Sequence, residues 1–349
     1  MTYRWLSHAA TAAALALALP CVPLDAQETE RHLLTGDRIT IWNLAGATTI
    51  EATTGNDVVV EVTRAGDDRR DLRVRAEGGE LAVLYPDRTI VYRTTRGGTY
   101  STRLYVDRQG RFNDESGAFP VRIRSSGPGL DAHANLRILV PKGRRVEVNI
   151  AAGTIEATNT EGDFALRTRF SPIQVTTHKG PLTAQTGSGS LRVSRVDGDA
   201  ILSTGSGSID MQDMRGTSLR ASTGSGRLEG REVTTERFVG STGSGSIRLE
   251  ATTASNVRTN TGSGSVRLDL RNTPKELSAR AGSGSIEISL PANTNVEVDV
   301  STGSGGISSD FPVTMESFRR RELRGKIGTG ADGYLRVSTG SGSVRLIRR

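Results

Sequence analysis

Apolar and polar residues alternate along most of this chain, and the alternation changes phase at short glycine-containing segments. In the run 182–186 (Leu-x-Ala-x-Thr) the apolar residues are even-numbered, whereas in the run 191–193 (Leu-x-Val) they are odd-numbered. A period of two is typical of half-buried β-strands. If both runs face one interior, the chain must bend at the Gly-Ser-Gly between them, because an unbroken strand would put them on opposite faces. The pattern therefore predicts a strand, a corner and a second strand.

The pentapeptide Thr-Gly-Ser-Gly-Ser, with one-residue variants, marks eight such corners. Successive copies are 18, 19, 19, 19, 20, 21 and 37 residues apart, and they begin at Thr186, Thr204, Thr223, Thr242, Thr261, Ala281, Thr302 and Thr339. A fixed period near 19 residues indicates stacked units, each long enough for two or three strands. Such a unit buries its apolar face only against its neighbours. The repeat therefore predicts an all-β fold, a single-stranded β-solenoid (β-helix) of ~19-residue coils.

Two glycines in each pentapeptide are expected to form the corner, because glycine reaches positive φ without steric cost. These predicted structural corners are Gly187, Gly189, Gly205, Gly207, Gly224, Gly226, Gly243, Gly245, Gly262, Gly264, Gly282, Gly284, Gly303, Gly305, Gly340 and Gly342.

Residues 27–145 show short alternating runs but lack the pentapeptide. The stretch from Tyr92 to Ala134 is rich in Arg and Gly and is expected to be a long loop. We interpret 27–145 as an irregular β region that caps the open end of the solenoid, with a small separate β unit as the alternative. The repeats then occupy 146–349, with a basic insertion at about 306–334 inside the 37-residue interval.

Residues 1–26 are typical of a signal peptide. Arg4 precedes an apolar run over 9–19, and a cleavage site follows Ala26. No later segment reaches 18 apolar residues, the length that a membrane-spanning helix needs. We therefore expect export to the periplasm, the outer surface or the medium. The alternative is a lipoprotein anchored through Cys21, the only cysteine of the chain.

Charge points to two kinds of surface. The formal net charge is +7. One outward position after the corner carries mixed signs and predicts ion pairs between neighbouring coils; it reads Arg192, Asp210, Glu229, Arg248, Arg267, Glu287, Ser308 and Arg345. The basic insertion is a candidate contact for a polyanion, an acidic surface polymer or a lipid headgroup, with a solvated loop as the alternative. Its cationic residues are Arg319, Arg320, Arg321, Arg324 and Lys326.

The order of these motifs resembles that of the bacterial putative-adhesin family. The resemblance rests on Leu139-Val140-Pro141, Gly153-Thr154-Ile155, the Gly-Ser-Gly coils, Asp310-Phe311-Pro312 and the last pentapeptide at Thr339. It covers nearly all of the chain after the signal peptide and is strongest from about 136 to 349. It implies an exported β-solenoid domain of unknown function and supplies no catalytic or binding residues.

The residues supply no catalytic, cofactor or metal motif. Neither the phosphate-loop nor the nucleophile-elbow pattern occurs, and His32, His133 and His178 each lack a second ligand at metal spacing. These histidines are interpreted as solvated surface residues. Carboxylates from different coils, such as Asp197 or Asp199 with Asp213, remain the one way to assemble a glycosidase-like pair.

We therefore expect an exported, non-enzymatic, adhesin-like β-solenoid with a binding or structural role at the cell envelope. Its expected partners are an acidic envelope polysaccharide, lipid headgroups or another surface protein. The alternative is a carbohydrate-active enzyme on a β-helix, and a third possibility is ice binding by the Thr/Ser ladder. Nucleic-acid binding is not expected, because the chain has an export signal and no aromatic residues interleaved with the basic ones.

Overall fold

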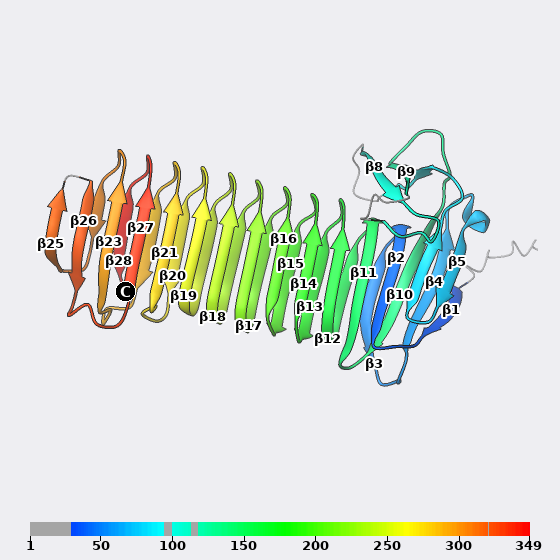
Figure 1. Ribbon diagram of the computed structural model, residues 1–349, viewed down its shortest axis with the longest axis horizontal. Coiled ribbons are helices and arrows are strands. Elements are labelled where there is room, and N and C mark those ends of the chain that lie inside the picture. Colours follow the sequence, from blue (N-terminus) through cyan, green and yellow to red (C-terminus); the bar gives the residue numbers. More distant parts are fainter. Residues whose placement is uncertain (1–28, 94–99, 113–117, 320) are drawn as a thin grey trace, which may run out of the picture.

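The computed structural model describes residues 29–93, 100–112, 118–319 and 321–349. Figure 1 shows a long stack of strands that runs from the N-terminal strands at one end to β25 at the other. The described residues contain β-strands and one 3-10 turn, Arg69–Asp71, so the predicted all-β solenoid is confirmed. The predicted signal peptide with Cys21 lies outside the described residues, as does Arg320.

Each coil contributes one strand to each of two facing sheets, which we name sheet I and sheet II. Sheet I contains the strands that precede the pentapeptide corner. In spatial order it consists of β5 (Arg73–Glu77), β6 (Glu80–Leu84), β2 (Arg38–Ala45), β11 (Arg144–Ala152), the second half of β12 (Ile155–Thr168), β14 (Leu182–Thr186), β16 (Ala200–Thr204), the second halves of β17 (Ile209–Thr223), β18 (Leu228–Thr242) and β19 (Ile247–Thr261), β21 (Glu276–Ala281), β27 (Tyr334–Thr339), β23 (Val296–Thr302), β26 (Glu322–Ile327) and β25 (Val313–Arg319).

Sheet II contains the strands that follow the corner. In spatial order it consists of β1 (Thr29–Leu34), β4 (Val58–Ala65), β10 (His133–Pro141), β3 (Thr48–Thr53), the first half of β12, β13 (Ile173–Lys179), β15 (Leu191–Asp197), the first halves of β17, β18 and β19, β20 (Val266–Leu270), β22 (Ile286–Leu290), β28 (Val344–Arg348) and β24 (Ile307–Ser309). Pairing is parallel along the stack and antiparallel only toward its two ends.

The space between the two sheets is filled by one continuous aliphatic core. Leu182 and Ala184 before the corner and Leu191 and Val193 after it are at most 2% exposed and belong to the same cluster. The phase change of the alternation therefore does mark a bend that turns both strands toward one interior, as predicted.

The threonine of each pentapeptide holds its corner closed. The Thr242 hydroxyl donates to the carbonyl oxygen of Gly226 on the preceding coil, 3.1 Å away, and accepts the Gly245 N–H at 3.0 Å. The same pair of bonds recurs at Thr204, Thr223, Thr261, Thr302 and Thr339. A threonine hydroxyl thus satisfies a backbone N–H group of its own coil and a backbone carbonyl of the adjacent coil.

The reason we gave for the corner glycines is wrong, although all sixteen lie in bends. None of them has positive φ. Each instead sits against the equivalent bend of the adjacent coil, so that a Cβ on Gly264 would overlap the Gly245 carbonyl. Left-handed glycines occur at the opposite corner, for example Gly180 with φ 113°. The pentapeptide glycines are therefore required by close stacking of backbones.

The last coil of the chain is not the last coil of the stack. β27 lies between β21 and β23 in sheet I, and β28 lies between β22 and β24 in sheet II. The coil formed by β23 and β24 is therefore displaced outward, and the β25–β26 hairpin pairs antiparallel with β23 beyond it (Figure 1). The 37-residue interval between the last two pentapeptides contains β24, the β25–β26 hairpin and β27, which brings the chain back to pair with β21.

The expectation of a long loop from Tyr92 to Ala134 is wrong. The described part of this segment contains β8 (Ser101–Val106) and β9 (Phe119–Arg124), which form a three-stranded sheet with β7 (Thr89–Val91). Alternating residues such as Leu104, Val106, Val121 and Ile123 build a second small core with the end of β2. The alternating run at Val121 and Ile123 does form a strand, whereas the run at Leu104 and Val106 was not recognised in the sequence.

The interpretation of the histidines as solvated fails most clearly at His178, which is 2% exposed. Its Nε2 lies 3.3 Å from the Pro181 carbonyl, which can only accept a hydrogen bond, so Nε2 donates and Nδ1 accepts from the Thr160 hydroxyl at 2.9 Å. The ring also packs against Phe164, with ring centroids 4.9 Å apart. His178 is thus a neutral part of the core.

The stability of the solenoid should fall when the pH drops below about 6.5, the ordinary pKa of histidine. Burial lowers the pKa of His178 in the folded state. Its contribution is then complete above the unfolded pKa and is lost toward acid, because the unfolded chain takes up the proton first. Urea unfolding at pH 7.5 and pH 5 should show a larger loss for the wild type than for His178→Gln; equal losses would contradict this account.

Candidate functional site

Several outward side chains of sheet II form ion pairs, although Arg192 and Arg231 on the same sheet have none among the described residues. Arg267 pairs with Glu287 on the next coil at 3.0 Å, which confirms one of the ion pairs expected between coils. Glu229 and Arg248 also face each other on neighbouring coils, but there the expectation is wrong, because each pairs within its own coil. Arg227 pairs with Glu229 at 3.0 Å and Arg248 with Glu250 at 2.5 Å. Exposed pairs of this kind contribute little to stability, but they leave these arginines less available for a ligand.

Sheet I differs in the middle of the stack, where four exposed arginines have no acidic partner among the described residues. These are Arg220, Arg237, Arg258 and Arg280, which we name the arginine face. The parallel register places Arg220, Val239 and Arg258 at equivalent positions on three successive strands. Because neighbouring strands are about 4.8 Å apart, the Cα atoms of Arg220 and Arg258 are separated by about 10 Å.

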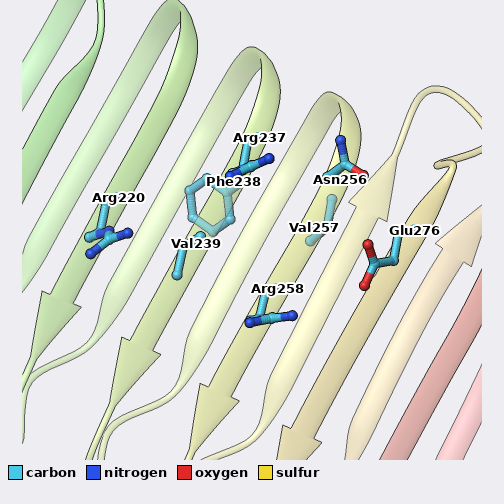
Figure 2. A pocket seen from close by; sticks show the side chains of 8 residues that line it. All are labelled: Arg220, Arg237, Phe238, Val239, Asn256, Val257, Arg258 and Glu276. Atoms are coloured by element: carbon cyan, nitrogen blue, oxygen red, sulfur yellow. The ribbon is translucent and has the colours of Figure 1, made fainter.

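A depression of about 330 Å³ lies among these arginines (Figure 2). Figure 2 shows Arg220 and Arg258 on either side of Val239, with Arg237 and Asn256 on the adjacent row, farther from the pentapeptide corner. Glu276 closes the far end of that row. The site therefore combines arginine guanidinium groups, the side-chain amide of Asn256 and a small apolar area around Val239. The hydrogen-bonded strands hold these groups on a rigid surface.

Four of the cationic residues predicted from the insertion, Arg319, Arg321, Arg324 and Lys326, lie on the β25–β26 hairpin at the end of the stack. Arg324 contacts Glu322 at 2.8 Å and Asp299 at 3.5 Å, and Lys326 contacts Glu316 at 3.4 Å. Arg319 and Arg321 make no ion pair with a described residue. The hairpin is therefore a partly neutralised cap, and it lies several coils away from the arginine face.

Two of the three carboxylates considered for an enzyme, Asp199 and Asp213, have local partners. One oxygen of Asp199 accepts the backbone N–H groups of Thr217 and Ser218 at 2.8 and 2.9 Å. Asp213 pairs with Arg215 at 3.2 Å. The described residues contain no group of three or more His, Cys, Asp or Glu placed to hold a metal ion. Nor does any helix there have the length and apolar character to cross a membrane.

Sequence reasoning missed the arginine face because it compared outward positions only after the corner. The signal was present in the strand before it, where Leu219-Arg220-Ala221 and Val257-Arg258-Thr259 place an arginine between two inward residues. Which arginines stand side by side, and that Glu276 is the acid beside them, follows only from the register.

Similarity to known proteins extends over nearly the whole chain. A family model described as Toastrack DUF4097 matches residues 37–346, and no curated protein matches the chain. Three solved structures are similar, each over 92% of this chain. A putative adhesin from Bacteroides fragilis is 11% identical with a TM-score of 0.36, over 96% of its own chain. A putative cell adhesion protein from Clostridium sporogenes is 9% identical, with a TM-score of 0.20 over 99% of its length.

The third similar structure is a putative lipid binding protein from Parabacteroides distasonis, 15% identical, with a TM-score of 0.42 over 96% of its chain. The family model extends over most of the chain, from residue 37, just before β2, to residue 346 in β28. The chain therefore belongs to the Toastrack DUF4097 family.

Proposed function

We propose that this protein is an exported, non-enzymatic, adhesin-like β-solenoid that binds an acidic polymer at the bacterial cell envelope through the arginine face. Export is supported by the signal-peptide pattern of residues 1–26. The alternative, a carbohydrate-active enzyme on the same scaffold, would need two converging carboxylates free of structural partners.

The observation that carries the proposal is the unpaired charge of Arg220, Arg237 and Arg258. Like charges on nearby strands cost stability, and at several other places this molecule sets acids beside its arginines. Arg137, for example, lies between Glu51 at 2.8 Å and Glu61 at 3.2 Å. Three unpaired arginines thus gather on adjacent strands of one rigid surface, which is an arrangement expected of a site that binds an anion.

The scaffold suits a long ligand. Parallel in-register strands repeat the arginine positions along the stack axis, so the charges are already in place before binding. A polyanion lying along this axis would meet successive arginines at intervals of one or two strands. The same geometry provides no deep apolar cavity at the arginine face, since the depression there is lined mainly by polar and charged side chains.

The proposal predicts that three substitutions on sheet I weaken binding while three on sheet II do not. The test variant is Arg220→Gln/Arg237→Gln/Arg258→Gln. The control, Arg227→Gln/Arg248→Gln/Arg267→Gln, removes the same charge from ion-paired positions. Retention on immobilised polygalacturonate should fall roughly tenfold or more for the test variant. Wild-type retention should also fall with salt, because exposed charges are screened over about 8 Å at physiological ionic strength.

A third variant, Arg319→Gln/Arg321→Gln, tests the hairpin as the binding site instead. Loss of retention in this variant alone would indicate that the β25–β26 hairpin, and not the arginine face, binds the polymer. Equal retention by the wild type and all three variants across the salt series would contradict a role for arginine in binding. Hydrolysis or elimination products released from the polymer would favour the enzyme alternative.

A further inference from the structure

A second depression opens on sheet I at the N-terminal end of the stack, about 590 Å³ in volume. We name it the Trp42 groove; it is lined by Trp42, Glu147, Arg167, Arg169, Gln185 and Ser203. Trp42 is an outward residue of β2, and its column continues through Asn149, Arg167, Gln185 and Ser203 to Ser222 on successive strands of sheet I. The groove and the arginine face therefore lie on one surface.

The tryptophan ring is held in a fixed orientation. Phe112 packs edge-on against it, with ring centroids 5.1 Å apart and an interplanar angle of 78°. Phe112 is itself 3% exposed in the small core beneath the three-stranded sheet. Trp42 is half-buried, so one part of the ring is supported while another lines the groove.

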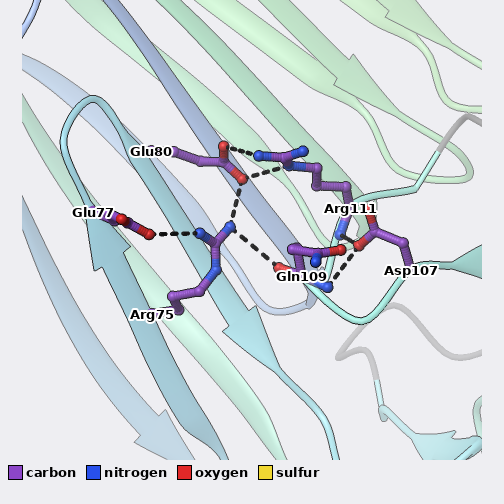
Figure 3. A network of polar contacts seen from close by, with 6 residues as sticks. All are labelled: Arg75, Glu77, Glu80, Asp107, Gln109 and Arg111. Atoms are coloured by element: carbon purple, nitrogen blue, oxygen red, sulfur yellow. Dashed lines mark hydrogen bonds and ion pairs between the residues drawn. The ribbon is translucent and has the colours of Figure 1, made fainter.

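The segment that carries Phe112 is anchored by the polar network in Figure 3. Glu80 accepts two hydrogen bonds from Arg111, at 2.7 and 2.6 Å, and one from Arg75 at 2.7 Å. Asp107 accepts the backbone N–H groups of Gln109 and Arg111 at 2.9 and 2.8 Å. The hydrogen bond from Arg111 lowers the pKa of Glu80, so the network stays charged at neutral pH. The aromatic support is thus tied to β6 of sheet I.

Polar side chains surround the ring. The Arg167 guanidinium contacts the Glu147 carboxylate and donates to the Gln185 side chain at 3.2 Å, which fixes the direction of its remaining donors. A rigid aromatic surface beside oriented hydrogen-bonding groups matches a pyranose ring, which has an apolar C–H face and hydroxyls at its rim. An acyl chain would instead need an apolar enclosure.

We propose that the Trp42 groove is a subsite for one sugar ring of an acidic polysaccharide whose uronate groups reach the arginine face. The inference rests on the proposed function, which it deepens by naming the polymer class. Five strand steps separate Trp42 from Ser222, the outward neighbour of Arg220, or about 24 Å along the stack. A chain of several sugar units spans both sites, and short oligomers reach only one.

Intrinsic fluorescence tests the subsite directly, because the chain has only two tryptophans, Trp5 and Trp42. In a Trp5→Phe background, oligogalacturonates should produce a saturable change in Trp42 fluorescence. Affinity for long oligomers should fall about tenfold in Trp42→Ala, less in Trp42→Phe, and not in the matched control Tyr105→Ala, an exposed aromatic on β8. Thermal unfolding of each variant confirms that the fold is retained.

The outcomes separate the subsite from the proposed function. Unchanged Trp42 fluorescence and unchanged Trp42→Ala affinity, with binding still dependent on Arg220 and Arg258, would overturn the subsite alone. Absence of binding to any acidic oligosaccharide would overturn both. A fluorescence change with vesicles of anionic phospholipid but not with oligogalacturonate would overturn the assignment to polysaccharide.

Discussion

Replacing Gly264 by alanine is expected to destabilise the protein by about 3 kcal/mol, although alanine is the smallest possible change. A Cβ at this position would overlap the carbonyl carbon and oxygen of Gly245 on the adjacent coil. These atoms are backbone and are themselves stacked on Gly226, so they cannot move without disturbing the next corner. The free energy of unfolding in urea measures the effect.

Gly306→Ala is the matched control for this substitution. Gly306 lies near the same corner of another coil, but a Cβ there would meet nothing within 4 Å, and its φ is outside the left-handed region. We expect a change within about 0.5 kcal/mol. If Gly264→Ala and Gly306→Ala were equally mild, close stacking would not be the reason for the pentapeptide glycines.

Removal of residues 334–349 should unfold the C-terminal coils of the stack, whereas the coils in the middle should remain folded. The deletion removes β27 and β28, which separate two other coils. Four fully buried side chains are lost, Leu335, Val337, Val344 and Leu346, for a total of about 6 kcal/mol or more of burial free energy. Stability in a solenoid is a sum of nearest-neighbour terms, so distant coils should be unaffected.

Hydrogen exchange resolves this prediction by segment. Amides of β23 and β26 should lose protection in the truncated chain, whereas those of β13 to β18 should keep it. A chain that lacks only Arg348 and Arg349 serves as control. Retained protection in β23 would contradict the prediction, because it would mean that the displaced coil can stack directly on β21 and β22.

The repeat made the coil predictable but not the order of coils. The phase change at each pentapeptide locates a corner independently of the neighbouring coils. Residues such as Leu182 and Leu191 were therefore enough to predict that each coil places one strand in each of two facing sheets. The stacking order of the coils could not be predicted from the sequence. The strand that contains Leu335 and the strand that contains Val298 have the same alternation, so either could pair with β21. Nearly equivalent coils leave the choice of neighbour to the hairpin that covers the exposed edge.

The candidate site was harder to predict than the fold for a related reason. The basic insertion was visible as a cluster in the sequence, yet Arg324 and Lys326 meet acids contributed by β23 and β25. Arg220, Arg237 and Arg258 are 17 to 21 residues apart in sequence and become neighbours only through the register. His178 shows the same limit, since its partners Thr160 and Pro181 come from a neighbouring coil and a following corner.

Arginine labelling with phenylglyoxal, read by mass spectrometry with and without polygalacturonate, tests the central claim most directly. The account predicts that the bound polymer protects Arg220, Arg237 and Arg258, while Arg248 and Arg267 on sheet II are modified equally in both samples. Protection confined to Arg319 and Arg321, or uniform modification of all arginines in the presence of bound polymer, would contradict it.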